Sequence, residues 1–170
     1  IVTHRAAGAL LAAAALAAAG CSGSGGPSDH DKMIEAQKGA ADTLAGAGVK
    51  TTQKTYTVGT GWVVDMTGVT VTDDLLQKVK MLGNIAELDM KNSTVTDAHL
   101  AKMRELDMHA LLNKLDLSNT AVTDAGLEKL DGNLFLAELN LTKTQVTAAG
   151  VEQFLKRRAA NPNVRVKNTR

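Results

Sequence analysis

The chain has 170 residues, a formal net charge of +1 and 22% charged residues. This length allows one domain plus a targeting segment, and the balanced charge gives no general attraction to nucleic acid or to acidic partners. The aromatic residues are one Trp, one Tyr and two Phe. The core must therefore rest on Leu, Val, Met and Ala, which suits thin stacked layers better than a single globular core.

The first 21 residues are predicted to be a secretory signal. An apolar run of Ala and Leu extends from Ala6 to Ala19, with Arg5 before it and small residues after it. The run is too short to span a bilayer as a stable anchor. The only cysteine, Cys21, follows Ala18-Ala19-Gly20. This arrangement resembles the lipobox of bacterial lipoproteins, which implies that Cys21 is the lipid attachment site, although Ala18 stands where leucine is commoner.

Residues 22–29 are predicted to be a flexible tether, because they are rich in Ser and Gly. Acyl chains on Cys21 would hold the protein on a membrane. By resemblance to lipoprotein sorting, Ser22 after the cysteine favours the outer membrane over the inner membrane. The alternative is that Cys21 is a stray residue in a conventional signal peptide. If Cys21 carries lipid, no cysteine remains for a disulfide, and packing alone must stabilise the exported domain.

Residues 30–61 are predicted to form an N-terminal cap. The apolar residues between His30 and Ala47 recur with a helical period, and Asp29 or Asp31 can cap this helix. Two short β-prone runs follow at 49–52 and 54–58. We expect Trp62 to fill the space between this cap and the next segment.

Residues 62–170 are predicted to form a repeat domain. The pairs Val71-Thr72, Val95-Thr96, Val122-Thr123 and Val146-Thr147 are spaced by 24, 27 and 24 residues. Each pair follows a short strand pattern in which two apolar residues flank a polar one. These patterns are Val64-Asp65-Met66, Leu88-Asp89-Met90, Leu115-Asp116-Leu117 and Leu139-Asn140-Leu141, with a fifth expected at Val164-Arg165-Val166. The apolar pair is expected to face the core and the polar residue to face solvent.

The segments between the strands are predicted to contain helices. Ser93, Thr120 and Thr144 can bond the turning backbone after three of the strands. The threonine of each VT pair stands where a helix N-cap belongs, and an aspartate usually follows it in the first turn. The inward helical stripe is expected to comprise Leu76, Leu100, Leu127 and Val151, each followed three residues later by Val79, Met103, Leu130 and Phe154.

The motif L-x-L-x-x-T-x-V-T-D-x-G-L resembles the leucine-rich repeats of the ribonuclease-inhibitor-like superfamily. The type that carries cysteine is the most similar, with threonine in place of cysteine. Short lipoproteins of this kind occur in planctomycete-like bacteria. The resemblance covers about residues 62–167 and implies a short α/β horseshoe, with a parallel sheet on the concave side and helices on the convex side. It also implies a binding scaffold, but it does not identify a ligand.

The concave face of the predicted sheet is the candidate partner-binding surface. Its central column is Asp65, Asp89, Asp116, Asn140 and Arg165. The flanking candidates are Glu87, Lys114, Glu138, Lys91 and Ser118. Neighbouring strands lie about 4.8 Å apart, so three aspartates would stand in a row and repel one another.

Several interpretations of this acidic column remain open. Lys91, Lys114 and water can offset the charge, or the column can receive a basic segment of a partner protein. A Ca²⁺ ion is a third option, although three carboxylates in a flat ladder make a poor cage. A hydrolase with the aspartates as its site is a fourth, but a flat ladder offers no cleft to exclude water and nothing that would separate two pKa values.

The rest of the sequence contains no pattern typical of a metal, nucleotide or nucleophile site. A C-terminal basic group comprises Lys156, Arg157, Arg158, Arg165, Lys167 and Arg170. It can neutralise a helix C-terminus or contact anionic lipid. We expect a monomeric, lipid-anchored cell-envelope protein that is not an enzyme, needs no cofactor or metal, binds no nucleic acid and recognises an unknown protein. The alternative is a structural envelope protein without a discrete ligand.

Overall fold

The computed structural model describes residues 28–56, 59–109, 111–158 and 164–169. The predicted signal peptide with Cys21, and nearly all of the predicted tether, lie outside the described residues.

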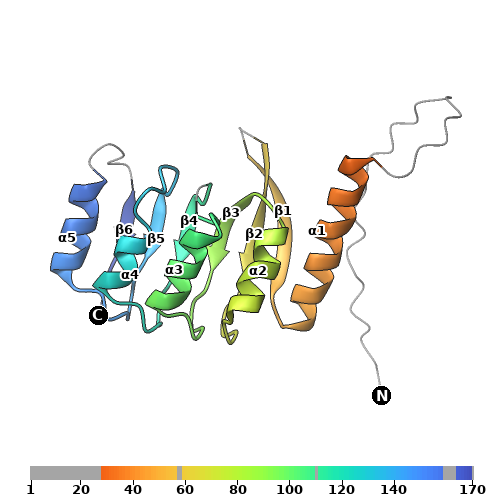
Figure 1. The fold of residues 1–170 in the computed structure, drawn as a ribbon. Helices are drawn as coiled ribbons and strands as arrows, with labels where there is room; N and C mark the ends of the chain where they lie inside the picture. Colours follow the sequence, from red (N-terminus) through yellow and green to blue (C-terminus); the bar gives the residue numbers. More distant parts are fainter. Residues whose placement is uncertain (1–27, 57–58, 110, 159–163, 170) are drawn as a thin grey trace, which may run out of the picture.

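Within the described residues the chain is an α/β protein with one six-stranded sheet and five helices (Figure 1). The spatial order of the strands equals their order in the chain, β1-β2-β3-β4-β5-β6. β1 pairs with β2 antiparallel, and every later pair is parallel. The strands are β1 (Lys50–Tyr56), β2 (Gly59–Asp65), β3 (Ile85–Asp89), β4 (Lys114–Asp116), β5 (Glu138–Asn140) and β6 (Arg165–Lys167). The helices are α1 (Asp29–Gly46), α2 (Asp73–Met81), α3 (Asp97–Glu105), α4 (Asp124–Lys129) and α5 (Ala148–Arg157).

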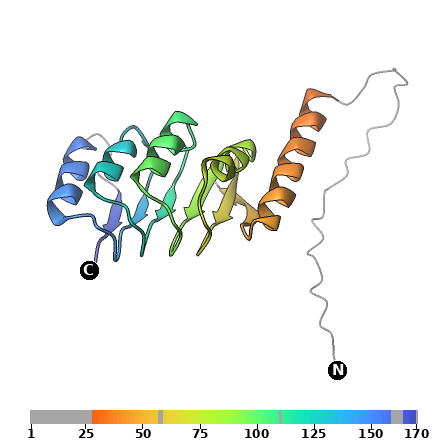
Figure 2. The same cartoon turned by 60° about the horizontal axis from the view of Figure 1, so that its bottom comes forward.

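Each connection between neighbouring parallel strands carries one of the helices α2 to α5. A parallel pair needs such a crossover, because the chain must return to the starting end of the sheet. The described helices form a layer on one side of the sheet, and the other side carries no described helix (Figure 2). The predicted α/β architecture with a mainly parallel sheet is therefore confirmed, and it is compatible with a solenoid-like fold.

The core lies between the sheet and this helix layer. The outer residues of the first four predicted strand triplets are all at most 2% exposed, from Val64 and Met66 to Leu139 and Leu141. Leu76, Leu100 and Leu127 from the helices are fully buried against them. Trp62 is partly buried and packs on the same cluster. The predicted alternation along the strands and the predicted helical stripe are both confirmed.

Hydroxyl groups close the turns that follow the strands. Ser93 Oγ donates to Met90 O at 2.6 Å, Thr120 to Leu117 O at 2.6 Å, and Thr144 to Leu141 O at 2.7 Å. The residue before each of these three hydroxyl residues, and the residue before Val69 in the equivalent first turn, has a left-handed backbone, with φ between 55° and 71°. These residues are Gly68, Asn92, Asn119 and Lys143. Gly and Asn adopt this conformation more readily than other residues, so Lys143 is the exception.

The helix N-caps are the predicted threonines Thr72, Thr96, Thr123 and Thr147. The aspartates that follow two of them have a further role that the sequence pattern did not reveal. Asp124 accepts hydrogen bonds from both the backbone N–H and the hydroxyl of Thr147, at 2.8 and 2.7 Å. Asp97 binds Thr123 in the same way, at 2.9 and 2.6 Å. The first residue of one helix therefore holds the cap of the next helix.

The N-terminal helix differs from its prediction in detail. Its N-cap is Ser28, neither Asp29 nor Asp31, and Asp31 completes a capping box by accepting from the Ser28 backbone at 3.0 Å. Ala40 and Leu44 are buried, whereas Met33 and Ile34 are about half exposed, so only the C-terminal half of α1 packs on the body. The two β-prone runs form one strand, β1, which extends the same sheet.

The predicted register of the last strand is wrong by two residues. Val166, not Val164, pairs with Leu139, so Lys167 stands beside Asn140 and Arg165 stands beside Glu138. The step from Leu139 to its partner is therefore 27 residues instead of 25. The error has a simple cause, because Val164-Arg165-Val166 offers two apolar residues and either can occupy the core position. Arg165 therefore leaves the central column, and Lys167 takes its place.

Candidate functional site

The sheet face opposite the helices carries the predicted candidate residues, and we call it the open face. Its residues form three rows across the strands, because side chains alternate between the two faces and the paired strands are in register. The central row is Asp65, Asp89, Asp116, Asn140 and Lys167; the upstream row is Val63, Glu87, Lys114, Glu138 and Arg165; the downstream row is Thr67, Lys91, Ser118, Thr142 and Thr169. The nine predicted partner-binding residues other than Arg165 lie on this face in their predicted rows, and Arg165 lies on it in the upstream row.

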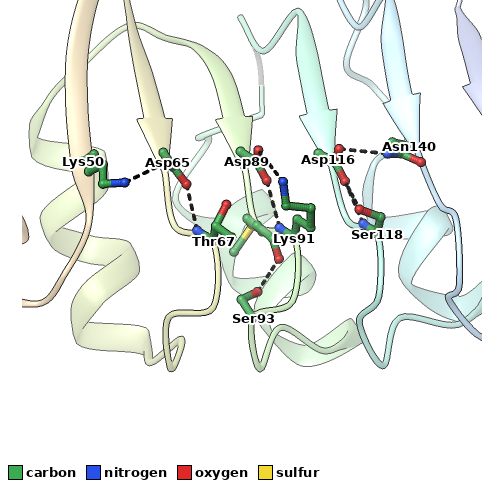
Figure 3. A network of polar contacts seen from close by, with 10 residues as sticks. Lys50, Asp65, Thr67, Asp89, Lys91, Ser93, Asp116, Ser118 and Asn140 are labelled. Atoms are coloured by element: carbon green, nitrogen blue, oxygen red, sulfur yellow. Dashed lines mark hydrogen bonds and ion pairs between the residues drawn. The ribbon is translucent and has the colours of Figure 1, made fainter.

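The central row has a structural role that the sequence analysis missed. In each of its first four members a side-chain oxygen accepts a hydrogen bond from the backbone N–H two residues later. Figure 3 shows this bond for Asp65, Asp89 and Asp116. The distance is 2.9 Å for Asp65, 3.0 Å for Asp89, 2.8 Å for Asp116 and 3.2 Å for Asn140. Such a bond satisfies the first amide after the strand and starts the turn. Asp or Asn is therefore required here to form the turn, whatever the face binds.

Ser118 belongs to the same structural motif. Both its backbone N–H and its hydroxyl donate to Asp116 Oδ1, the hydroxyl at 2.6 Å. The other oxygen of Asp116 accepts from Asn140 Nδ2 at 2.8 Å. Both oxygens of this carboxylate are therefore engaged within the protein. Asp116 and Ser118 have less freedom to bind a ligand than the sequence pattern indicated.

Lysines partly offset the charge of the central row. Lys91 Nζ lies 4.0 Å from Asp89 Oδ2, and Lys50 Nζ lies 3.9 Å from Asp65 Oδ2 (Figure 3). Lys91 was expected in this role, whereas Lys50 comes from β1, which no part of the repeat pattern covers. Lys114 was also expected to act here, but its Nζ pairs with Glu138 at 3.3 Å. The row is thus not a free column of negative charge.

The surroundings keep two of these carboxylates ionised. Hydrogen bonding by Thr67 lowers the pKa of Asp65, and nearby Lys50 and Lys91 add to this effect. Partial burial opposes ionisation of Asp116, but the hydrogen bonds from Ser118 and Asn140 outweigh it and lower its pKa. A general acid needs the opposite shift, toward a raised pKa. The lowered pKa values of Asp65 and Asp116 are thus opposite to the shift that a glycosidase general acid needs.

Glu87 joins β1 to β3 across the open face. Its Oε1 accepts from Lys54 Nζ at 2.7 Å and from the Tyr56 hydroxyl at 2.8 Å. Burial opposes ionisation of Glu87, but these two donors outweigh it and lower its pKa. Burial and the neighbouring Glu87 carboxylate raise the pKa of Tyr56 to about 12. The ammonium of Lys54 also lies 5.2 Å from the centre of the Tyr56 ring, so the three side chains form one cluster.

Charges alternate along the upstream row. From β3 to β6 its members are Glu87, Lys114, Glu138 and Arg165, whereas its β2 member, Val63, is apolar. Lys54 of β1 lies beside Gly61 in the strand register, and its ammonium reaches Glu87 at 2.7 Å. Opposite charges on neighbouring strands attract one another and stabilise the sheet by up to about 1 kcal/mol per pair. This row therefore has a structural role as well as an exposed polar surface.

A shallow hollow of about 290 Å³ lies at the C-terminal end of the open face. Its lining comes from three neighbouring strands: Lys114, Leu115 and Asp116 of β4, Glu138, Leu139 and Asn140 of β5, and Arg165, Val166 and Lys167 of β6. Four of the predicted candidates, Lys114, Asp116, Glu138 and Asn140, line this hollow together with Arg165 of the predicted central column. Sequence reasoning did not assign Lys167 to the central row, because the register of β6 was misread.

The C-terminal basic group does not form one patch in the described residues. Arg157 pairs with Asp131 at 2.7 Å, and Lys156 pairs with Glu152 at 2.7 Å. Arg158 is buried and lies over the Phe154 ring at 5.3 Å. Only Arg165 and Lys167 of the described members face the hollow. The alternative interpretation, in which the C-terminal basic group contacts anionic lipid as one surface, is therefore less favoured.

Lys54 and Tyr56 were missed by sequence reasoning, and a signal for them exists in hindsight. The sequence of β1 is Lys50-Thr51-Thr52-Gln53-Lys54-Thr55-Tyr56. Lys50, Lys54 and Tyr56 are an even number of residues apart, so their side chains lie on the same face of the strand. The sequence does not show that this is the open face of the sheet, because that depends on the antiparallel pairing of β1 with β2.

In the described part of the chain, no group of three or more His, Cys, Asp or Glu residues is arranged to hold a metal ion. No described helix combines the length and the apolar character needed to cross a membrane. Comparison with protein-family models and with curated proteins found no match to this chain.

Proposed function

We propose that this chain is a leucine-rich-repeat domain of a lipid-anchored cell-envelope protein, which binds a partner protein through its open face. The sequence motif and its spacing support the leucine-rich-repeat assignment. The sequential strand order, with a helix in every parallel crossover, is what such a repeat requires. The lipobox-like sequence around Cys21 supports the anchor and a place in the outer membrane.

The observation that carries the binding proposal is the exposed and ordered array of charges on the open face. Lys114 and Glu138 are each half exposed, and Asp65, Asp89 and Lys91 are 38–44% exposed. No described helix covers them (Figure 2). Side chains that are held in fixed positions but remain open to solvent can pair with a partner at a small cost in conformational entropy.

The size of the face limits the partner that it can accept. Strands β2 to β6 span about 19 Å, at about 4.8 Å per strand. That width suits one loop, strand or helix of a partner, so we expect micromolar rather than tight binding. Asp65, Asp89 and Asp116 start turns and have hydrogen-bond or ion-pair partners within the protein. The structure therefore favours a basic partner segment on the central row less than the sequence alone did. A structural envelope protein without a ligand remains the second candidate, since the same contacts also stabilise the sheet.

Photo-crosslinking on both sides of the sheet tests the proposal. A benzoylphenylalanine residue is introduced at Lys91 or Lys114 on the open face, and at Lys80 or Lys129 on the helix side as the matched control. We expect irradiation of cells that export the full chain to yield a discrete adduct from the open-face positions alone. Adducts that form equally from both sides, or none from the open face, would favour the structural role.

A further inference from the structure

We propose that the hollow at the C-terminal end of the open face binds an extended acidic peptide segment, with Arg165 and Lys167 as its anchors. This inference rests on the proposed function and specifies the chemistry of the partner. It reverses the charge of the segment that the aspartate column led us to expect.

The charged residues that line the hollow are three cations, Lys114, Arg165 and Lys167, and two carboxylates, Asp116 and Glu138, so its net charge is +1. Asp116 has both oxygens in hydrogen bonds, to Ser118 and to Asn140. Glu138 pairs with Lys114 at 3.3 Å. Among the described residues, no ion pair or hydrogen bond involves the Arg165 guanidinium or the Lys167 ammonium. These two groups therefore attract an anion from outside the chain.

The spacing of the two cations favours a peptide. Arg165 and Lys167 flank Val166, which packs toward the core, so both side chains are on the open face. Residues two apart on a strand are separated by about 6.6 Å, which is also the separation of alternate side chains in an extended peptide. Arginine can hold one carboxylate through two parallel hydrogen bonds, and lysine can hold the next as a point charge.

The neighbouring carboxylates argue against a membrane surface as the ligand. Glu138 stands beside Arg165 in the strand register, and Asp116 lies one strand further on. A continuous layer of anionic headgroups would be repelled by both. A peptide that carries acidic residues only at alternate positions can turn its neutral residues elsewhere, and it needs to meet only the two cations.

Fluorescence anisotropy at low salt tests this inference with two labelled peptides of equal composition. One has glutamate at alternate positions between serines, and the other has its glutamates in one block. We expect the alternating peptide to bind more tightly, with an affinity that falls as salt is added. Arg165→Glu together with Lys167→Glu should weaken its binding at least tenfold. Arg165→Gln with Lys167→Gln repeats the test without charge reversal, and thermal unfolding checks that each variant folds.

The matched control is Lys38→Glu with Lys80→Glu, which changes the net charge equally but acts on exposed helix positions. It should alter binding less than twofold. Equal losses in both double variants, or no binding of the alternating peptide, would overturn the inference. The inference would also be overturned if the protein bound phosphatidylglycerol vesicles but not the peptide, and Arg165→Glu with Lys167→Glu abolished the vesicle binding. A dimer in sedimentation that the same double variant dissociates would overturn it too. Open-face crosslinks without peptide binding would refute only this inference, whereas their absence would refute the proposed function.

Discussion

Lys143 has a backbone conformation that an ordinary side chain disfavours. Its φ is 57°, and the equivalent turns after the other strands place Gly68, Asn92 or Asn119 there. The left-handed conformation costs about 1–2 kcal/mol for a residue with a β-carbon, and asparagine lowers this cost by local hydrogen bonding. We therefore expect Lys143→Asn to stabilise the protein by about 1 kcal/mol in urea unfolding.

The control for this change is Lys143→Ala, which removes the charged side chain but keeps the β-carbon. It should give no comparable gain. If Ala stabilises as much as Asn, the effect comes from the lost charge and not from the backbone.

Glu87 contributes stability that depends on pH. Its folded pKa is lowered, so the folded state binds fewer protons than the unfolded state in the window between the two pKa values. The contribution is fully present above about pH 4.3, the ordinary value, and is lost as the pH falls through the folded pKa. We expect Glu87→Gln to cost about 1 kcal/mol at pH 7, because a charged acceptor is lost, and less at pH 3, below the ordinary pKa of Glu.

Urea unfolding at both pH values measures this difference. Glu128→Gln in α4 is the matched control, because Glu128 is exposed and has no described side-chain partner; it should change stability little at either pH. A deficit for Glu87→Gln that is as large at pH 3 as at pH 7 would contradict the assigned role of the charge.

At the scale of elements, the link between consecutive helices explains a glycine. A β-carbon at Gly150 of α5 would overlap the carboxyl group of Asp124, which holds Thr147 at the start of the same helix. Gly126 has the same relation to Asp97. The aspartate and the glycine of the D-x-G motif are therefore linked between consecutive helices. The aspartate carboxyl of one helix occupies the space that a β-carbon would need at the glycine position of the next helix.

The junction between α2 and α3 is built differently. His99 stands where Gly126 and Gly150 stand, and its Nδ1 accepts from the Thr96 N–H at 3.1 Å. In α3, the acceptor for the N–H of the cap residue is therefore the imidazole of His99 in the same helix. In α4 and α5 the acceptor is an aspartate of the preceding helix. The two solutions exclude each other, because a side chain at this position fills the space of the carboxylate.

A double-mutant cycle tests the coupling between Asp124 and Gly150. Gly150→Ala alone should destabilise by about 1–3 kcal/mol, as overpacking does. In the Asp124→Ala background the obstacle is gone, so the same change should be neutral or stabilise by up to about 1 kcal/mol, as expected for Ala over Gly in a helix. Denaturant unfolding of the four proteins measures the coupling.

Gly39 of α1 provides the control, since a β-carbon there meets nothing within 4 Å. Gly39→Ala should stabilise similarly in both backgrounds. Should Gly150→Ala cost the same with and without Asp124, the coupling would be refuted.

At the scale of the whole molecule, a lipid anchor at Cys21 would determine where the open face could meet a partner. α1 begins at Asp29, only eight positions after Cys21, so an acylated Cys21 would keep the domain close to the membrane surface. We expect radiolabelled palmitate to enter the full-length protein and to be absent from the Cys21→Ser variant. Ser22→Ala is the control and should remain labelled. Incorporation that survives Cys21→Ser would refute the lipid anchor.

The elements that the sequence predicted well are those with a local signal. The core positions Leu88, Leu115 and Leu139 follow from alternation, and the caps Thr72 and Thr147 follow from their place before an apolar helical stripe. The cap of α1 was misassigned, because Ser28, Asp29 and Asp31 are all good capping residues. The register of β6 was misread, because Val164 and Val166 both fit a core position.

The sequence by itself determined the α/β architecture, the strand and helix positions and the row of polar side chains on one face. These follow from periods of two and 3.6 residues and from a spacing near 25, which depend on neighbours in the chain. Only the tertiary structure decided what the polar residues do. The aspartates of the central row accept hydrogen bonds from backbone amides, and Lys50 and Lys54 come from a strand outside the repeat pattern. Among the described residues, Arg165 and Lys167 have no side-chain hydrogen bond or ion pair. Those roles depend on which strands lie side by side, and no local pattern encodes that.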